Sequence, residues 1–257
     1  MHLFKGFCIS CAIYSKLPVP QFEWKEEDMR YHLCFFPFIG IIIGAIELLW
    51  FFLCTKAELN TVCRVLIAAA IPILITGGFH IDGFMDTMDA LHSFQDSKKK
   101  LEILRDPHIG AFSVIMLLCY TLIYVGALAE LVNWNQIFIF GIGFALSRSL
   151  SGMAVVSFPM AKKDGMVAYF SDYAQKKRVF MILLFQSIIF AIAMIFVEPR
   201  SGCTSILFVL LFYLYYYQKS KKEFGGISGD TAGCFVTICE VVILVSLIAT
   251  QIIYANF

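Results

Sequence analysis

The sequence predicts an all-α integral membrane protein with about seven transmembrane helices and a short N-terminal helix that is interfacial or re-entrant. Its 257 residues are 60% hydrophobic, 16% aromatic and only 15% charged, whereas soluble domains average about 45–50% apolar and about 25% charged residues. The apolar residues form runs long enough to cross a bilayer as helices, and basic residues gather in alternate connecting segments. Together these observations indicate a chain that folds in lipid.

The charge balance limits the partners. A net charge of +1 gives no general attraction for a polyanion, so we expect no nucleic-acid partner. The hydrophobic content makes the lipid bilayer the expected surroundings. The sequence leaves a homo-oligomer open.

Seven stretches have the length and composition of transmembrane helices, because a bilayer core of about 30 Å needs roughly 20 apolar residues. They are 32–54, 61–79, 110–132, 135–157, 179–197, 203–217 and 232–254. The sixth is short but ends in tyrosines, which suit an interfacial aromatic belt. The stretch 3–17 is too short to span and precedes Pro18 and Pro20, which predicts the interfacial or re-entrant helix. No repeat or linker divides the chain, so we expect one polytopic domain over 1–257.

Lysine and arginine residues orient these helices. The segments that carry most of them are 17–31, 80–109, 159–178 and 218–231, which share one side if the seven helices alternate. The other side has only Lys56, Arg64 and Arg200. The positive-inside rule therefore places the long basic segments in the cytoplasm.

Three aspartates follow the second expected span. Asp82, Asp86 and Asp89 fall within a narrow arc if their segment is helical, because they stand at i, i+4 and i+7. Crowded carboxylates at a membrane boundary are unfavourable without a cation, and oxygen ligands favour Mg²⁺, Mn²⁺ or Ca²⁺ over zinc. The alternative is a solvated acidic face at a helix end, which the intervening apolar residues disfavour. His80 would point away from the aspartates and suits a substrate contact or a base.

Two arginines suit an anionic substrate. Arg105 can clamp a phosphate while the adjacent Asp106 supplies an oxygen ligand. Arg148 lies inside the fourth expected span, where an arginine is costly unless it has a partner or faces a water-filled cavity. It either pairs with Glu47 or Glu240 or contacts the substrate, and the sequence favours neither reading.

A glycine-rich segment precedes the last expected span. Gly225, Gly226 and Gly229 would let backbone N–H groups approach a phosphate closely. Asp230 either caps the following helix or completes a metal site. With the aspartates on the same side of the membrane, this segment suggests phosphate chemistry assisted by a divalent metal.

In order and spacing, these blocks resemble the cobalamin synthase family, the adenosylcobinamide-GDP ribazoletransferases of bacteria and archaea. The matching blocks are Gly77–Gly83 with Asp86, Thr87 and Asp89, Glu102–Asp106 with Gly110, Ser147–Arg148, and Gly225–Gly226 with Gly229–Thr231 and Gly233. The segments 17–20 and 36–40 also look familial. Ala90, Pro107 and Ser228 depart from the residues usual in the family, but none of these removes a carboxylate or an arginine.

The resemblance implies the last joining step of the cobalamin nucleotide loop. A ribose hydroxyl of α-ribazole or of its 5′-phosphate attacks the phosphate next to cobinamide in adenosylcobinamide-GDP, which releases GMP and gives adenosylcobalamin or its 5′-phosphate. Mg²⁺ is the expected cofactor and the bacterial cytoplasmic membrane the expected location. The roles implied are catalysis by Asp82, Asp86, Asp89 and His80, metal binding by Asp82, Asp86, Asp89, Asp106 and Asp230, and substrate binding by Arg105, Arg148, Gly225, Gly226, Gly229 and Thr231.

Other classes of membrane protein are weighed against this one. The aspartate group is also similar to the carboxylate motif of CDP-alcohol phosphotransferases. A membrane prenyltransferase would be expected to carry two aspartate motifs, whereas this chain has one cluster. A secondary transporter would explain Arg148, Glu47 and Glu240, but transporters usually carry internal repeats.

Overall fold

The computed structural model describes residues 2–20, 22–162 and 165–254, and these are helical with no strand beyond one isolated bridge between Met160 and Ile227. The long helices are α3 (Phe36–Lys56), α4 (Thr61–Thr76), α5 (Phe79–His92), α7 (Ala111–Ala129), α8 (Trp134–Ser157), α10 (Lys176–Val197), α11 (Pro199–Phe224) and α12 (Gly229–Tyr254). The short ones are α1 (His2–Tyr14), α2 (Glu26–Met29), the 3₁₀ helix η1 (His32–Phe35), α6 (Ser97–Ile103) and α9 (Met166–Tyr173). The all-α fold expected from the sequence is confirmed.

Five helical segments are long and apolar enough to cross a bilayer: His32–Lys56, α7, α8, α10 and α12. The pair α4 and α5 would make a sixth, although it bends by 96°. The expected sixth span, 203–217, lies in α11, whose tyrosines and polar ends keep its hydropathy lower. The structure thus gives five or six spans by composition where the sequence suggested seven.

The bend between α4 and α5 falls inside the second expected span. The stretch 61–79 was expected to be continuous, but α4 ends at Thr76 and α5 begins at Phe79. Between them Gly77 and Gly78 have φ values of +66° and +81°, a left-handed conformation that costs glycine little. The turn lets α5 leave the direction of α4 and pack along α12.

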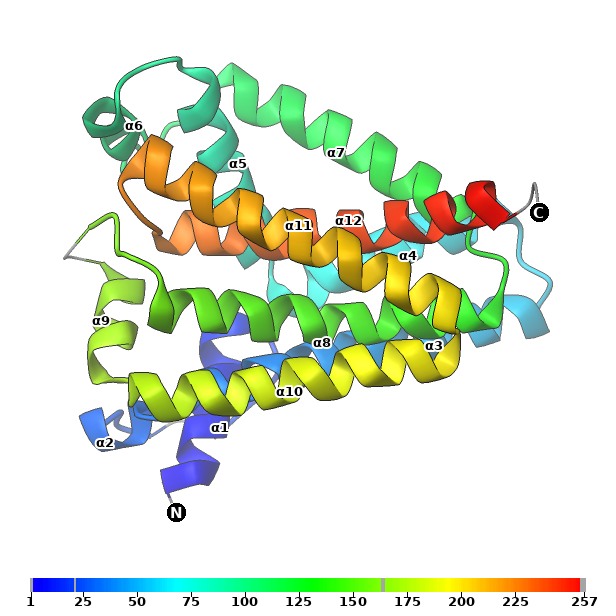
Figure 1. Ribbon diagram of the computed structural model, residues 1–257, viewed down its shortest axis with the longest axis horizontal. Helices are drawn as coiled ribbons and strands as arrows, with labels where there is room; N and C mark the ends of the chain where they lie inside the picture. Colours follow the sequence, from blue (N-terminus) through cyan, green and yellow to red (C-terminus); the bar gives the residue numbers. More distant parts are fainter. Residues whose placement is uncertain (1, 21, 163–164, 255–257) are drawn as a thin grey trace.

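Helix α8 lies at the centre of the bundle and packs against α3, α10 and α12 (Figure 1). Nearly all its residues from Gln136 to Val156 are buried. At Gly40 and Gly44 of α3, a Cβ atom would collide with the backbone of α8. Small residues therefore set the distance between these two helices, as is common in membrane bundles.

Hydroxyl groups join the helices inside the bundle. Ser149 of α8 is 2.8 Å from Ser187 of α10, and Ser205 of α11 is 2.7 Å from Ser246 of α12. Such hydrogen bonds tie helices together where apolar contacts alone are not specific.

The outer faces of the long helices expose large apolar side chains, the reverse of a water-soluble bundle. Leu74, Leu122, Phe185 and Phe196 are between 64% and 84% exposed. A soluble protein would rarely leave so many such residues uncovered, so these faces indicate contact with lipid.

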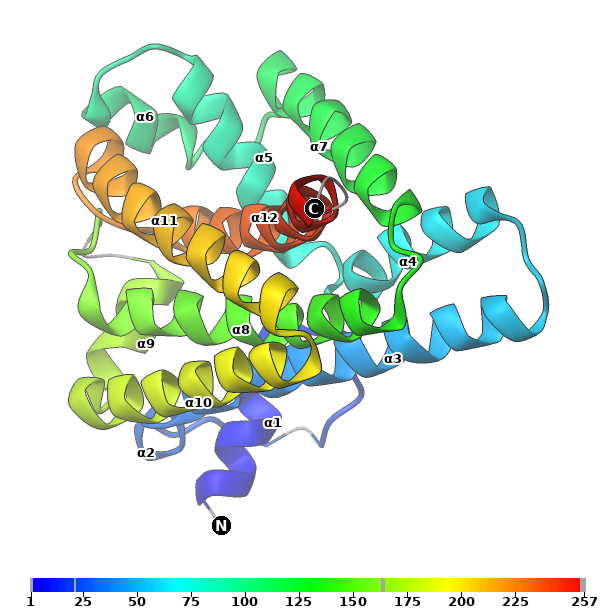
Figure 2. The same cartoon turned by 45° about the vertical axis from the view of Figure 1, so that its right-hand side comes forward.

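Segments expected on one side of the membrane do gather at one end of the bundle. Figures 1 and 2 show α2, α6, α9 and the turn from α11 to α12 on the same side of the molecule, and Figure 1 shows the C-terminus at the opposite end. Helix α1, which is apolar and 13 residues long, contacts α2, η1 and α3. Its length agrees with the expected short N-terminal helix.

Candidate functional site

The first turns of α5 and α12 cross with their backbones almost in contact. A Cβ atom on Gly83 would lie 2.7 Å from the carbonyl oxygen of Asp230, and one on Gly233 would lie 3.4 Å from Cα of His80. The hydroxyl of Thr237 on α12 also donates to the carbonyl oxygen of His80, at 3.1 Å. This crossing brings Asp82 and Asp230, which are 148 positions apart in the sequence, to one place.

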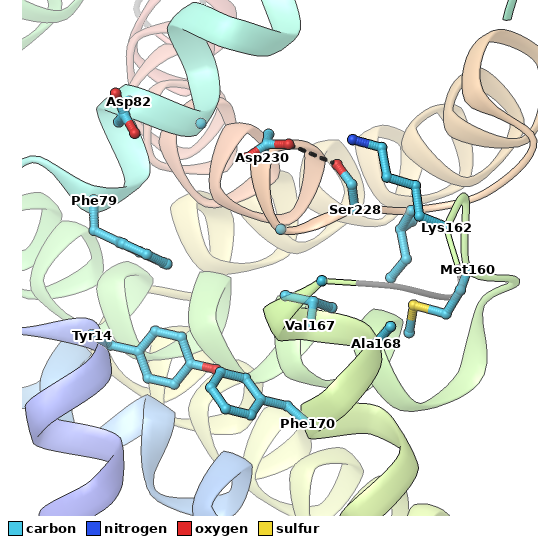
Figure 3. Close-up of a pocket in the computed structure, with 14 residues that line it drawn as sticks. Tyr14, Phe79, Asp82, Met160, Lys162, Val167, Ala168, Phe170, Ser228 and Asp230 are labelled. Carbon is cyan, nitrogen blue, oxygen red and sulfur yellow. Dashed lines mark hydrogen bonds between the residues drawn. The ribbon is translucent and has the colours of Figure 1, made fainter. Parts of the chain in front are cut away.

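Asp82 and Asp230 line a cavity of about 220 Å³ at the end of the bundle that carries α6 and α9. Its other walls come from α1, α9, the start of α12 and the segment around Met160. Figure 3 shows the two carboxylates with Ser228 and Lys162 on one side, and the rings of Tyr14, Phe79 and Phe170 on the other. Lys162 is within electrostatic range of Asp230. The cavity therefore has a polar wall of mixed charge and an aromatic wall.

The N-terminus of α12 carries a cap formed by Ser228 and Thr231, and Asp230, which accepts from Oγ of Ser228 at 3.3 Å, lies between this cap and the cavity. The backbone N–H of Ser228 donates to Oγ1 of Thr231 at 2.8 Å, and the N–H of Thr231 donates to Oγ of Ser228 at 3.3 Å. This reciprocal pair is the arrangement of a capping box. Asp230 therefore takes part in the hydrogen bonds of the helix end and also lines the cavity. Thr231 is buried and engaged in the cap, so its hydroxyl faces the helix end.

Asp86 and Asp89 extend the acidic group along α5. Asp86 is half-buried and interacts electrostatically with Asp82, Asp89 and Asp230. Asp89 points to the start of α7, where a Cβ atom on Gly110 would overlap its carboxylate. The absence of a side chain at Gly110 is thus what makes room for Asp89.

The four carboxylates suit a hard cation by their donor chemistry. Carboxylate oxygens are the ligands that Mg²⁺ takes in proteins, and Mg²⁺ usually keeps several waters and uses one or two carboxylates. Within the described part of the chain, no group of three or more His, Cys, Asp or Glu side chains is arranged so that it could hold a metal ion. An ion at this cavity would therefore have Asp82 and Asp230 as its available carboxylate ligands and waters as the others.

Arg105 and Asp106 lie apart from this cavity. Both are exposed after the end of α6, and neither lines the cavity. Asp106 accepts from the backbone N–H of His108 at 3.0 Å and its Oδ1 is 2.6 Å from Nδ1 of the same histidine. These hydrogen bonds lower the pKa of Asp106. Its carboxylate is engaged within its own turn.

Two of the three expected phosphate-binding glycines have structural tasks instead. Gly225 ends α11 with a φ of +75°. A Cβ atom on Gly226 would collide with the segment 159–161, which pairs with Ile227 through hydrogen bonds of 2.8 Å. Gly229 alone of the three lines the cavity.

His80 and Arg148 belong to a second polar group, inside the bundle. His80 is 5% exposed, packs against Phe36 and has both ring nitrogens unpartnered within the described residues. Arg148, 1% exposed, donates to Glu240 at 2.7 Å and to the carbonyl oxygen of Phe144 at 2.9 Å. The geometry favours the ion pair with Glu240 over a substrate contact for this arginine. Both residues line a small space of about 20 Å³, which is large enough for one water.

Glu47 of α3 also belongs to this buried group. It is fully buried, and neither carboxylate oxygen has a hydrogen-bond partner among the described residues. Glu47 and Glu240 interact electrostatically. The sequence named both glutamates as partners for Arg148, and the structure selects Glu240.

The sequence reasoning missed most of the cavity wall. From the sequence, Tyr14, Phe79 and Phe170 could not be told from other residues of apolar segments. Lys162 was used only as one of the basic residues that orient the helices in the membrane. The available signal was the apolar character of the short segments that form α1 and α9. Because these segments are far from Asp82 along the chain, the sequence did not show that they lie near it in space.

Comparison with known proteins decides the family. A family model described as cobalamin-5-phosphate synthase matches residues 6–248. The chain belongs to this family. The matched region includes the cavity, the aspartates and the buried arginine.

Individual relatives agree. An adenosylcobinamide-GDP ribazoletransferase of Lachnoclostridium phytofermentans is 42% identical over 232 residues, which cover 90% of this chain and 88% of the relative. One of Clostridium perfringens is 32% identical over 240 residues, covering 92% and 94%. One of Clostridioides difficile is 24% identical over 249 residues, covering 94% and 96%. No solved structure matches this chain.

Proposed function

We propose that this protein is an adenosylcobinamide-GDP ribazoletransferase in the cytoplasmic membrane of a bacterium, with its site facing the cytoplasm. The observation that carries the proposal is the 42% identity to a protein of that name over 90% of the chain. The cavity supports it, because two carboxylates and a lysine stand beside a wall suited to an apolar ligand. The basic segments gathered at the cavity's end of the bundle support the orientation.

The proposed reaction replaces the phosphoanhydride bond of the donor's pyrophosphate with a phosphodiester bond. The oxygen of a ribose hydroxyl of α-ribazole, or of its 5′-phosphate, forms a bond to the phosphorus next to cobinamide. The bond from that phosphorus to the GMP oxygen breaks, and GMP leaves. A carboxylate of the cavity takes the hydroxyl proton. Such transfers depend on in-line placement and on neutralising the phosphate charge.

The residues of the cavity divide these tasks. Asp82 or Asp230 accepts the proton. Lys162, at the other end of the same polar wall, contacts a phosphate. Asp82 and Asp230, with Asp86 close behind, would also hold Mg²⁺, which when bound neutralises charge on the pyrophosphate. Asp89, His80 and Asp106 do not line the cavity, so the proposed reaction gives them no direct contact with the substrate.

The direct test is GMP release by the purified protein in nanodiscs. Adenosylcobinamide-GDP, α-ribazole and Mg²⁺ are supplied together, and GMP and the corrinoid product are measured by chromatography and mass spectrometry. We expect equal amounts of both products, and none when α-ribazole is omitted. GMP that forms without α-ribazole, or no GMP at all, contradicts the proposal. Asp82→Asn, prepared in the same way, controls for contaminating activity.

The orientation has its own test. A cysteine placed at the exposed Ser97, on a cysteine-free background, should resist an impermeant thiol reagent in intact cells and react after lysis. Reaction in intact cells would place the cavity on the other side of the membrane.

A further inference from the structure

The aromatic wall of the cavity is built before any ligand arrives. Tyr14 of α1 lies against Phe36 with ring centroids 4.2 Å apart, and Phe79 of α5 meets Tyr14 edge-on at 5.9 Å. Phe170 of α9 is supported from behind by His32, at 4.8 Å. Each ring is thus held by a neighbour from another element, although α1, α5 and α9 are distant in the sequence.

The opposite walls differ in chemistry. Tyr14, Phe79 and Phe170 are joined by the apolar side chains of Met160, Val167 and Ala168, whereas the charged groups gather on the other side (Figure 3). A flat apolar ring bound at the aromatic wall would lie beside the carboxylates without entering the polar wall. Of the described side chains on the apolar side, only Tyr14 carries a polar group.

We propose that Tyr14, Phe79 and Phe170 bind the benzimidazole base of the acceptor nucleoside, and that this wall does not take the guanine of the donor. This inference rests on the proposed function. Guanine, the base of the donor, presents donors and acceptors along its edges, and burying these without partners is costly. A benzimidazole ring has few such groups and stacks on aromatic side chains.

The size of the cavity is consistent with one nucleoside. Its volume of about 220 Å³ lies below the range of about 300–1,000 Å³ that is usual for drug-sized ligands. It therefore suits a ligand of the size of one base with its ribose, and a second cavity of about 460 Å³ adjoins it at Phe79 and Asp82. A base seated on the aromatic wall directs its ribose toward Asp82 and Asp230, where the hydroxyl must lose its proton.

The test separates binding of the acceptor from binding of the donor. Phe170→Leu and Phe79→Leu keep an apolar side chain but remove the flat ring. Phe170 is the cleaner position, because α9 carries none of the four aspartates. We expect the KM for α-ribazole to rise about 5- to 150-fold, the range that one base–aromatic stack contributes, while the KM for adenosylcobinamide-GDP stays within about twofold. Phe212→Leu is the matched control, because Phe212 stacks on Phe235 away from this cavity.

A second measurement uses the unaltered protein. Benzimidazole riboside should inhibit competitively against α-ribazole but not against adenosylcobinamide-GDP, and inosine should inhibit far more weakly. An unchanged KM for α-ribazole in both leucine variants, a rise in the donor KM instead, or equal inhibition by inosine would overturn the inference. Wild-type protein that releases no GMP would refute the proposed function itself, which is a different outcome.

Discussion

The crossing of α5 and α12 offers the sharpest test of how the fold makes the site. We consider Gly83→Ala, which adds one methyl group where the two backbones meet. The new Cβ would lie 2.7 Å from the carbonyl oxygen of Asp230, 3.0 Å from its Cα and 3.2 Å from its carbonyl carbon. Ordinary contact begins at about 3.4 Å, so the helices must separate by about 0.7 Å. Because every colliding atom is backbone, no side-chain rotation relieves the overlap.

The separation should act more on catalysis than on folding. Overpacking of this kind costs about 1–3 kcal/mol of stability. Misplacing reacting groups by about 1 Å can cost about 100-fold in rate, and Gly83→Ala moves Asp82 relative to Asp230 directly. We therefore expect kcat to fall about 10- to 100-fold, with the protein still folded in the membrane.

A graded series supplies the controls. Gly233→Ala at the same crossing would bring its Cβ to 3.4 Å from His80, an ordinary contact, and should have a small effect. Gly126→Ala on α7 meets nothing within 4 Å and should leave turnover unchanged. Ribazole-dependent GMP release is measured at matched expression, and melting temperature in detergent reports stability. Turnover of Gly83→Ala within twofold of wild type would refute the idea that this crossing sets the site.

Three further outcomes are expected. Asp86→Asn should lower turnover by at least tenfold and raise the Mg²⁺ concentration needed for half-maximal rate; a rate equal to wild type at limiting Mg²⁺ would remove Asp86 from the shared acidic group. Arg148→Met should lower the free energy of unfolding by about 3–5 kcal/mol, because it leaves Glu240 buried and unpaired. Adding Glu240→Gln should restore most of the melting temperature and of the turnover. If stability returns without turnover, the arginine acts on the substrate. Glu223, whose pKa is lowered to about 2 mainly by hydrogen bonds from Lys100 and Lys219, contributes stability that is present above its unfolded pKa of about 4.3 and lost as pH falls toward 2. Glu223→Gln should therefore lower the melting temperature at pH 7 but not near pH 2, and an equal loss at both pH values would contradict the ion-pair origin.

Part of the site could be predicted from the sequence, and part of it could not. The sequence identified Asp82, Asp86 and Asp89 correctly as one face of a helix, because helical spacing is a local property. It could not tell whether Asp230 capped its helix or faced a site. In the structure Ser228 and Thr231 form the reciprocal cap, and Asp230 lines the cavity next to it. The phosphate-binding role expected of Gly225 and Gly226 stays a prediction; in the structure Gly225 ends α11 and Gly226 packs on the segment 159–161.

The sequence by itself determined that this chain is a helical membrane protein with its acidic and basic segments on one side. Those properties follow from composition, from the length of apolar runs and from charge along the chain, none of which requires a tertiary contact. Only the tertiary structure decided that Gly77 and Gly78 turn α5 away from α4 and onto α12, and that Arg148 pairs with Glu240 rather than with Glu47. It also decided that rings from α1, α5 and α9 face Asp82 and Asp230 across one cavity. The physical reason is that such contacts depend on how closely whole helices approach, and this distance is set by small residues such as Gly83, whose partner lies far along the chain.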